Sequence, residues 1–445
     1  MSQATLVEDK SRAPRSLWRN RDFLLLWSGQ TAGAVGPQIT LVALPLIALR
    51  ELRASTFDVS LLTFFGWLPF LVFSLPAGVL ADRWDQRRIM ICCDLTRLVL
   101  LTSLPVLSLA GLLDLWSMYA VVTATGFLTV LFTVAYRSQL PKLISGSQLV
   151  DGNGKLGMSE SLAEMIGPSI GGLLAGVVGA SRALYGNVTT YAISALALRM
   201  IREPAQPAGT TAPSDEPDAA SSTGATQTAD DEPETVRASI KSGLAYVLHE
   251  RVLRALLICT SLSNFFVIAV SAIGVAYLAR TLHAAPVAIG LTFTGGAVGG
   301  LVAGGLAARV SRRVGSARII WLSMAVPGPF YLLMPLARPG WGVALYAVGT
   351  AAYAAAVTFF NASAISYRQT VCPPRLLNRV NSAYLWLAYG SLPLGSLFGG
   401  ALGTALGLRT TVLVCVLGAW AVSLFVIFSP LRGMRDIPEA APSAT

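Results

Sequence analysis

The chain has 445 residues and a net charge of +10, with 54% hydrophobic and 13% charged residues. Soluble domains carry about 25% charged residues, so this composition excludes a water-soluble globule of this length. It predicts a protein whose solvent is lipid.

The sequence predicts an all-α membrane protein with twelve spanning helices. Each predicted span is a largely apolar segment near the length of about 20 residues that a helix needs to cross the hydrocarbon core. Helices are expected because backbone groups in lipid must pair within their own segment. In chain order the segments are 23–49, 56–81, 89–110, 115–136, 156–179, 183–201, 255–279, 286–308, 317–337, 341–366, 380–405 and 409–430.

The basic residues follow the predicted loops. The side that would carry both termini holds 26 of the 33 Lys and Arg residues, and the loops of the other side hold 6. We therefore predict a multi-pass protein of the cell (inner, or cytoplasmic) membrane. The positive-inside rule places both of its termini in the cytoplasm. The same distribution argues against a nucleic-acid partner, and residues 1–22 form a cytoplasmic tail without the apolar core of a cleaved signal peptide.

The chain divides into two similar halves. Residues 23–201 and 253–430 would each form a six-helix bundle, and 431–445 a cytoplasmic tail. Between the halves we predict a disordered acidic linker over 202–234 and an interfacial amphipathic helix over 235–252. GVLADRWDQR at 78–87 is echoed by GGLAARVSRR at 304–313, and GPSIGG at 167–172 by GSLFGG at 395–400. Two echoes at nearly one offset indicate an internal repeat.

The stretch GVLADRWDQRR, residues 78–88, follows the second predicted span. We predict that residues 82–88 form a tight cytoplasmic hairpin. The positive-inside rule accounts for part of its arginines, but it gives no reason for Asp82, an acid that a helix N-terminus or an arginine would have to stabilise.

This stretch resembles the signature loop of the major facilitator superfamily, Gly-x-x-x-Asp-Arg-x-Gly-Arg-Arg, with Asp85 in place of the second glycine. The resemblance extends over all twelve spans and is closest to drug and siderophore exporters, through RDFLLLWSGQ at 21–30 and CDLTRLVLL at 93–101. It implies two pseudo-symmetric bundles locked by a cytoplasmic gate, with Asp82 facing Arg379. The gate residues would be Gly78, Asp82, Arg83, Arg87, Arg88, Asp94 and Arg97.

A second pattern lies in the fifth predicted span. Small residues at intervals of three or four let helices pack closely, and a proline bends its helix. The set is similar to the fifth-span motif of antiporters in this superfamily, although Ala163 replaces one glycine. Its members are Gly154, Gly167, Pro168, Gly171 and Gly172. Ordinary packing of a glycine-rich helix is the alternative.

Two acids within the same span are candidates for proton coupling. Glu160 and Glu164 are four residues apart and share a helix face, where two carboxylates repel each other. Ionisable groups inside spans are functional candidates, so we expect Glu164 to couple protons or bind substrate, with Glu160 assisting. The alternative is that they pair with a local base such as Lys155.

Cargo should bind near the midplane between the halves. Aromatic side chains with a few hydrogen-bonding groups favour a hydrophobic or amphiphilic small molecule. The candidate residues are Gln38, Phe64, Trp67, Thr129, Asn264, Phe265, Tyr353, Phe360 and Asn361.

No cofactor or metal site is expected, because the sequence has no Walker-A phosphate loop and its five cysteines lack metal-ligand spacing. We expect a monomer in the lipid bilayer that exports its substrate by alternating access. The resemblance of the fifth-span motif to that of antiporters implies that export is exchanged for protons. The alternatives are an uptake symporter or uniporter of the same fold, and a membrane enzyme or sensor.

Overall fold

The computed structural model describes residues 17–144, 148–201 and 244–437, except for the side chains of Arg19, of residues 74–83 and of a few residues within 141–150 and 374–383. The described residues form helices and short connections, without a strand. The predicted all-α fold is therefore confirmed. The predicted linker at 202–234 lies outside the described residues, and of the predicted helix at 235–252 residues 244–249 are helical.

Helices of the first half are long and follow one another with short connections. They are α1 (Arg21–Arg50), α2 (Thr56–Arg83), α3 (Gln86–Leu109), α4 (Leu115–Leu143), α5 (Leu149–Val177) and α6 (Ala180–Met200). Polar caps start several of them: Ser55 and Asp58 form a capping box at α2, and Asp114 and Ser117 form one at α4.

The second half contains α8 (Arg251–Ala276), which continues into the π-helical turn η3 (Tyr277–Thr281), and α9 (Pro286–Val314). After them come α10 (Arg318–Ala325), α11 (Gly328–Tyr331), α12 (Leu333–Leu336), α13 (Gly342–Val371), α14 (Pro374–Ala405), α15 (Leu408–Ala421) and α16 (Ser423–Ile427). Of the helical segments in the described part of the chain, ten are long and apolar enough to cross a membrane, and α5 and α6 are not among them. The count of twelve spans stays a prediction.

The ninth predicted span is broken into α10, α11 and α12, around Pro327 and Pro329. Proline cannot donate a backbone hydrogen bond, so the break frees carbonyl groups that lipid cannot satisfy. Trp420 Nε1 donates to one of them, Ala325 O, at 3.1 Å. At the end of α12, Tyr277 Oη donates to Met334 O at 3.2 Å and Arg409 Nη2 donates to Ala337 O at 2.7 Å.

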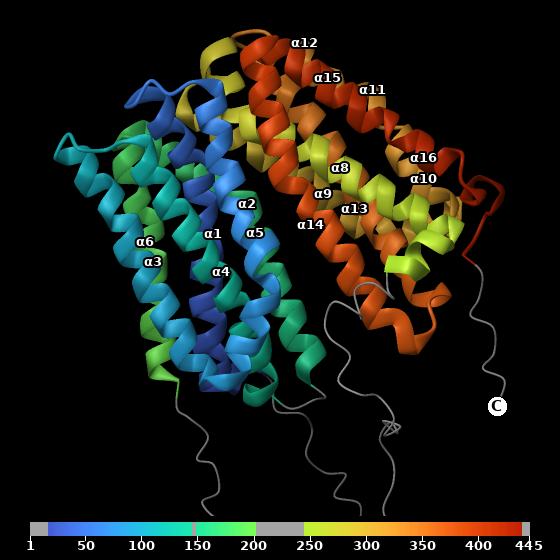
Figure 1. Ribbon diagram of the computed structural model, residues 1–445, viewed down its shortest axis with the longest axis horizontal. Helices are drawn as coiled ribbons and strands as arrows, with labels where there is room; N and C mark the ends of the chain where they lie inside the picture. Colours follow the sequence, from blue (N-terminus) through green and yellow to red (C-terminus); the bar gives the residue numbers. More distant parts are fainter. Residues whose placement is uncertain (1–16, 145–147, 202–243, 438–445) are drawn as a thin grey trace, which may run out of the picture.

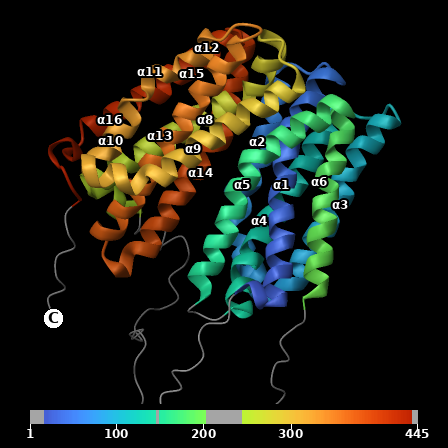
Figure 2. The same ribbon diagram turned by 180° about the vertical axis from the view of Figure 1, so that it is seen from behind.

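The helices form two bundles, α1–α6 and α8–α16, that meet near α12 and diverge toward the opposite end (Figures 1 and 2). We call this diverging end, which carries Leu17, Ile201 and Leu244, the terminal end. One hydrophobic core joins residues of both bundles, among them Val59, Leu184 and Ile273. At the terminal end each bundle has a separate core.

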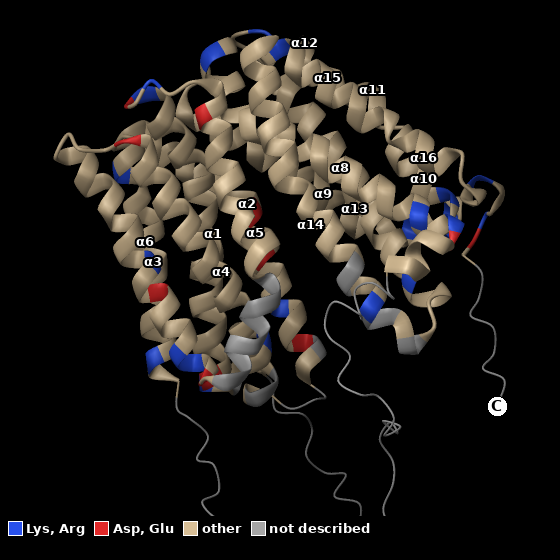
Figure 3. Cartoon of the chain, viewed as in Figure 1, with Lys and Arg blue, Asp and Glu red and all other residues tan. Residues whose placement is uncertain are grey.

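Charged residues gather at the two ends of the helices, and few lie between them (Figure 3). This distribution is the one that a lipid-embedded bundle requires, because an isolated charge in hydrocarbon is strongly destabilising. The hairpin after α2 is shorter than predicted: α2 continues to Arg83 and α3 begins at Gln86, so Asp82 and Arg83 are helical.

Candidate functional site at the interface between the bundles

Two helix pairs form most of the interface between the bundles: α5 packs against α9, and α2 against α14. Helices in lipid associate through close van der Waals packing, for which small residues are needed. Glycines occupy both crossings, so the sequence permits direct contact between backbones.

The crossing of α5 and α9 is closed by Gly172 and Gly290. A Cβ atom on Gly172 would lie 2.4 Å from the carbonyl oxygen of Pro286, and one on Gly290 would lie 2.3 Å from that of Pro168. Ser169 Oγ and Thr294 Oγ1 share a hydrogen bond of 2.6 Å across the same interface. The halves therefore touch here without room for one added methyl group.

At the crossing of α2 and α14, glycines of α14 pack against small side chains of α2. A Cβ atom on Gly400 would lie 1.8 Å from Ser60 Oγ, and one on Gly403 would lie 2.9 Å from Thr56 Cγ2. All these contacts lie in the parts of the helices away from the terminal end. Nearer the middle, the rings of Trp67 and Tyr389 stack across the interface with centroids 6.2 Å apart.

The fifth-span glycines serve different neighbours. Gly167 and Gly171 face α1, where added Cβ atoms would lie 2.5 Å from Gln38 Cβ and 2.9 Å from Ile39 Cα, whereas Gly172 faces α9. Gly154 has no neighbour within 4 Å of an added Cβ. The motif thus packs α5 against α1 of its own bundle and against α9 of the other bundle.

Glu160 and Glu164 have exposed side chains on α5, the helix that forms the interface with α9. Among the described residues, neither has an ion pair or a side-chain hydrogen bond. Lys155, the base considered as their partner, instead binds Asp151 at 2.6 Å. The two carboxylates are close enough to interact electrostatically with each other.

Asp94 and Arg97, both in the predicted gate set, form an ion pair, with Arg97 Nη2 3.1 Å from Asp94 Oδ1. The pair is buried inside the first bundle, where Asp94 is 1% and Arg97 5% exposed. The guanidinium group also lies 4.5 Å from the centroid of Phe132 on α4 and 4.9 Å from that of Tyr191 on α6. These contacts join α3 to its neighbours within one bundle.

The side chains of Gly78, Asp82 and Arg83 lie outside the described residues, so the predicted contact with Arg379 stays a prediction. Arg87 donates from Nε to Leu198 O and from Nη2 to Arg199 O, both at 2.8 Å. It therefore bonds to the last carbonyls of α6.

Asp85, which replaces the second glycine of the signature loop, has a local structural role. Asp85 caps α3, accepting from the backbone of Arg88 at 2.7 Å. An aspartate is a better helix cap than most residues, so its place at the start of α3 has a local reason. The Arg88 side chain is exposed.

The remaining predicted cargo residues are distributed over both bundles. Phe64, Thr129 and Phe265 are half-buried, and Asn361 is exposed. Asn264 donates to Ala388 O at 3.2 Å. Phe360 packs in the core of the second bundle, where it is 2% exposed, so it does not line a surface. Tyr353 borders a cavity inside the second bundle.

Sequence reasoning missed several residues of this interface. Gly290, Ser169 with Thr294, and Tyr389 bring the bundles together, but each depends on a partner that is distant in sequence. The GG pairs in α5 and α14 were the available signal. In the described part of the chain, no group of three or more His, Cys, Asp and Glu side chains could hold a metal ion.

Comparison with known families decides what kind of protein has this interface. The profile of the Major Facilitator Superfamily matches residues 26–395. The chain belongs to this superfamily. The predicted family is confirmed, and this facilitator is a multi-pass membrane transporter of small molecules rather than an enzyme.

Two relatives and one solved structure resemble this facilitator over most of its length. It is 28% identical over 428 residues to the multidrug efflux pump Tap of Mycolicibacterium fortuitum, covering 93% of this chain and 97% of that protein. It is 23% identical over 407 residues to macrolide efflux protein A of Streptococcus pyogenes, covering 88% and 94%. A bacterial homologue of the human lysosomal transporter Spinster, in an inward-facing and unoccupied conformation, shares the fold with a TM-score of 0.72 and 13% identity, covering 93% of this chain and 97% of that one.

Proposed function

We propose that this facilitator exports a hydrophobic or amphiphilic small molecule, such as an antibiotic, in exchange for protons. Relatives named as multidrug and macrolide efflux pumps support export. Aromatic rings at the interface, such as the Trp67 and Tyr389 pair, suit a largely apolar cargo better than a sugar or an ion.

Transport would proceed by alternating access of the two bundles. With both termini in the cytoplasm, the described conformation is the inward-facing one, because the described close contacts between bundles lie away from the terminal end. Breaking the glycine contacts of α5 with α9 and of α2 with α14 would then open the outer side.

Glu164 carries the coupling proposal. It is exposed on a helix of the interface, it has no ion pair among the described residues, and Glu160 lies one turn away. An unpaired carboxylate inside a membrane protein is strongly disfavoured, which favours taking up a proton. Glu164 would be protonated while the transporter without cargo returns from the outward-facing to the inward-facing state. Release of this proton to the cytoplasm would restore the Glu164 carboxylate, which can then bind cargo.

Everted membrane vesicles test this proposal with ethidium and erythromycin as probes. We expect wild-type vesicles, in which the cytoplasmic face is outside, to accumulate a probe when a proton gradient is applied and to lose this accumulation with an uncoupler. Glu164→Gln should abolish gradient-driven accumulation, and Glu160→Gln should reduce it.

Asp151→Asn is the matched control on α5, because Asp151 is exposed and its pair with Lys155 is of a kind that adds little stability. It should transport as wild type does. Gradient-driven accumulation by Glu164→Gln at the wild-type rate and pH dependence would refute the coupling role. Probe movement out of everted vesicles would instead indicate uptake.

A further inference from the structure

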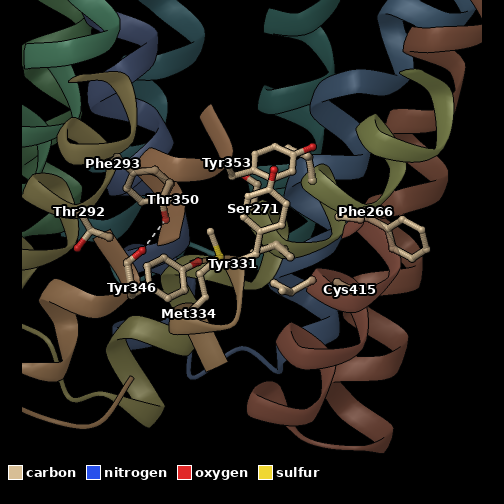
Figure 4. Close-up of a pocket in the computed structure, with 14 residues that line it drawn as sticks. Phe266, Ser271, Thr292, Phe293, Tyr331, Met334, Tyr346, Thr350, Tyr353 and Cys415 are labelled. Atoms are coloured by element: carbon tan, nitrogen blue, oxygen red, sulfur yellow. Dashed lines mark hydrogen bonds between the residues drawn. The ribbon is translucent and has the colours of Figure 1, made fainter. Parts of the chain in front are cut away.

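A cavity of about 180 Å³ lies inside the second bundle, apart from the interface between the bundles. Its walls come from α8, α9, α11, α12, α13 and α15 (Figure 4). The break in the ninth predicted span borders it, because Tyr331 of α11 and Met334 of α12 are part of its wall. This cavity therefore belongs to one bundle, and of the residues predicted to bind cargo only Tyr353 lines it.

The lining of the cavity is aromatic and uncharged. Phe266, Phe293, Tyr331, Tyr346 and Tyr353 contribute rings, and none of the described residues that line it is charged. A cation or an anion would lose its hydration here without a counter-charge, so the chemistry of the wall excludes ionic ligands. Aromatic rings instead pack favourably against other aromatic rings, edge to face or offset.

One polar group in the wall lacks a partner. Tyr331 is 1% exposed, and its hydroxyl has no hydrogen-bond partner among the described residues. Two other hydroxyls of the wall are paired: Tyr353 with Ser263 at 2.7 Å, and Thr350, which donates to the backbone oxygen of Tyr346 at 2.9 Å. A buried hydroxyl without a partner is destabilising, so an occupant that accepts a hydrogen bond from it would be favoured.

The size of the cavity limits the occupant to a small molecule. An apolar cavity of about 150 Å³ in another protein takes up one benzene molecule. We propose that this cavity binds one neutral aromatic molecule of a single ring, with an acceptor atom that the Tyr331 hydroxyl bonds. This site does not depend on the direction or coupling of transport.

The test uses two fluorinated probes that differ at one atom. 4-Fluoroanisole has an ether oxygen where 1-ethyl-4-fluorobenzene has a methylene group, so only the first can accept a hydrogen bond. Binding to the full chain in lipid nanodiscs is followed by 19F NMR as the probe concentration is raised. The amount of probe bound at a specific site reaches a plateau, whereas the amount partitioned into lipid rises linearly with concentration.

We expect saturable binding of both probes to the wild type, with the ether bound about 3- to 10-fold more tightly, as one net hydrogen bond implies. Tyr331→Phe should remove this preference while leaving the binding of the hydrocarbon. Ala419→Leu, which fills the cavity from α15, should abolish saturable binding of both probes.

Ala421→Leu is the matched control, because Ala421 lies on the same helix and is exposed. It should bind as the wild type does. Linear partition in the wild type, or saturable binding that Ala419→Leu leaves unchanged, would overturn the proposed site. Equal affinity for the two probes would overturn the hydrogen bond from Tyr331, and Tyr331→Phe provides the decision if Ala419→Leu does not fold.

Discussion

Asp94 and Arg97 show what a charge requires inside a lipid-embedded bundle. Each is almost fully buried, and the aromatic rings of Phe132 and Tyr191 complete the surroundings of the guanidinium group. Removing one partner of such a pair leaves the other charge buried and uncompensated.

Asp94→Asn should therefore destabilise the protein by about 3–5 kcal/mol, the cost of breaking a buried ion pair. Thermal unfolding of the purified protein in detergent measures this as a lowered Tm. Asp151→Asn breaks an exposed pair and should change stability by no more than about 1 kcal/mol. Equal Tm values for the two variants would contradict the structural role of the buried pair.

Residue-scale prediction succeeded where the partner was local. Asp94 and Arg97 lie three residues apart on one helix, a spacing at which opposite charges can pair, and they form an ion pair. Arg87 was expected at a gate between bundles, yet it bonds to Leu198 O, a partner 111 residues away on α6. No local pattern could show that contact, because it depends on which helices become neighbours.

At the scale of elements, the crossing of α5 and α9 depends on glycine. Because a Cβ atom on Gly172 would lie 2.4 Å from Pro286 O, the two helices cannot keep their distance if one methyl group is added. Overpacking of this kind destabilises a contact by about 1–3 kcal/mol.

Gly172→Ala should therefore shift the population away from the described conformation, by roughly 5- to 150-fold for that range of free energy. Spin labels at positions 112 and 341, in exposed loops of the two bundles, report the change as a longer distance between them. Gly154→Ala is the control on the same helix, since nothing lies within 4 Å of the added methyl group. An unchanged distance distribution in Gly172→Ala would refute the role of this crossing.

The elements themselves were largely predictable, because a hydrophobic segment of sufficient length has few alternatives in lipid. The predicted segments 56–81 and 286–308 correspond to α2 and α9, which extend further toward the terminal end. The break of the ninth span was not predicted. A hydropathy average over the segment does not detect the break. The side chains that bond to carbonyls of this segment, such as Trp420 to Ala325 O, come from other parts of the chain.

At the scale of the whole molecule, the distribution of basic residues predicts how the protein is oriented in the membrane. Leu112 lies in an exposed loop away from the terminal end, and Arg435 is exposed beyond α16. On the proposed topology the first faces the cell exterior and the second the cytoplasm.

Single cysteines at these positions, in a variant without the five native cysteines, test the orientation with a membrane-impermeant maleimide. Leu112→Cys should be labelled in intact cells, and Arg435→Cys only after the membrane is made permeable. The opposite pattern would invert the topology and make the described conformation outward-facing.

Family and architecture could be predicted from sequence because repeated motifs and span lengths are properties of the chain. The close contacts between the bundles could not, because each joins residues that are distant in the sequence; on the proposed alternating access, the same sequence would also pack in a second conformation. The GG pairs at 171–172 and 399–400 marked helices of the interface, but Ser60 and Gly290 became visible only in the folded structure.

The broken ninth span also constrains biosynthesis. Trp420 bonds to Ala325 O at the break and Arg409 bonds to Ala337 O at the end of the segment, and they follow those carbonyls by 95 and 72 residues. When ribosomes have delivered only α10, α11 and α12 to the insertion machinery, part of that backbone has no permanent partner. Chains truncated before Arg409 should therefore integrate less stably into the membrane than the full chain, and membrane proteases should degrade them faster.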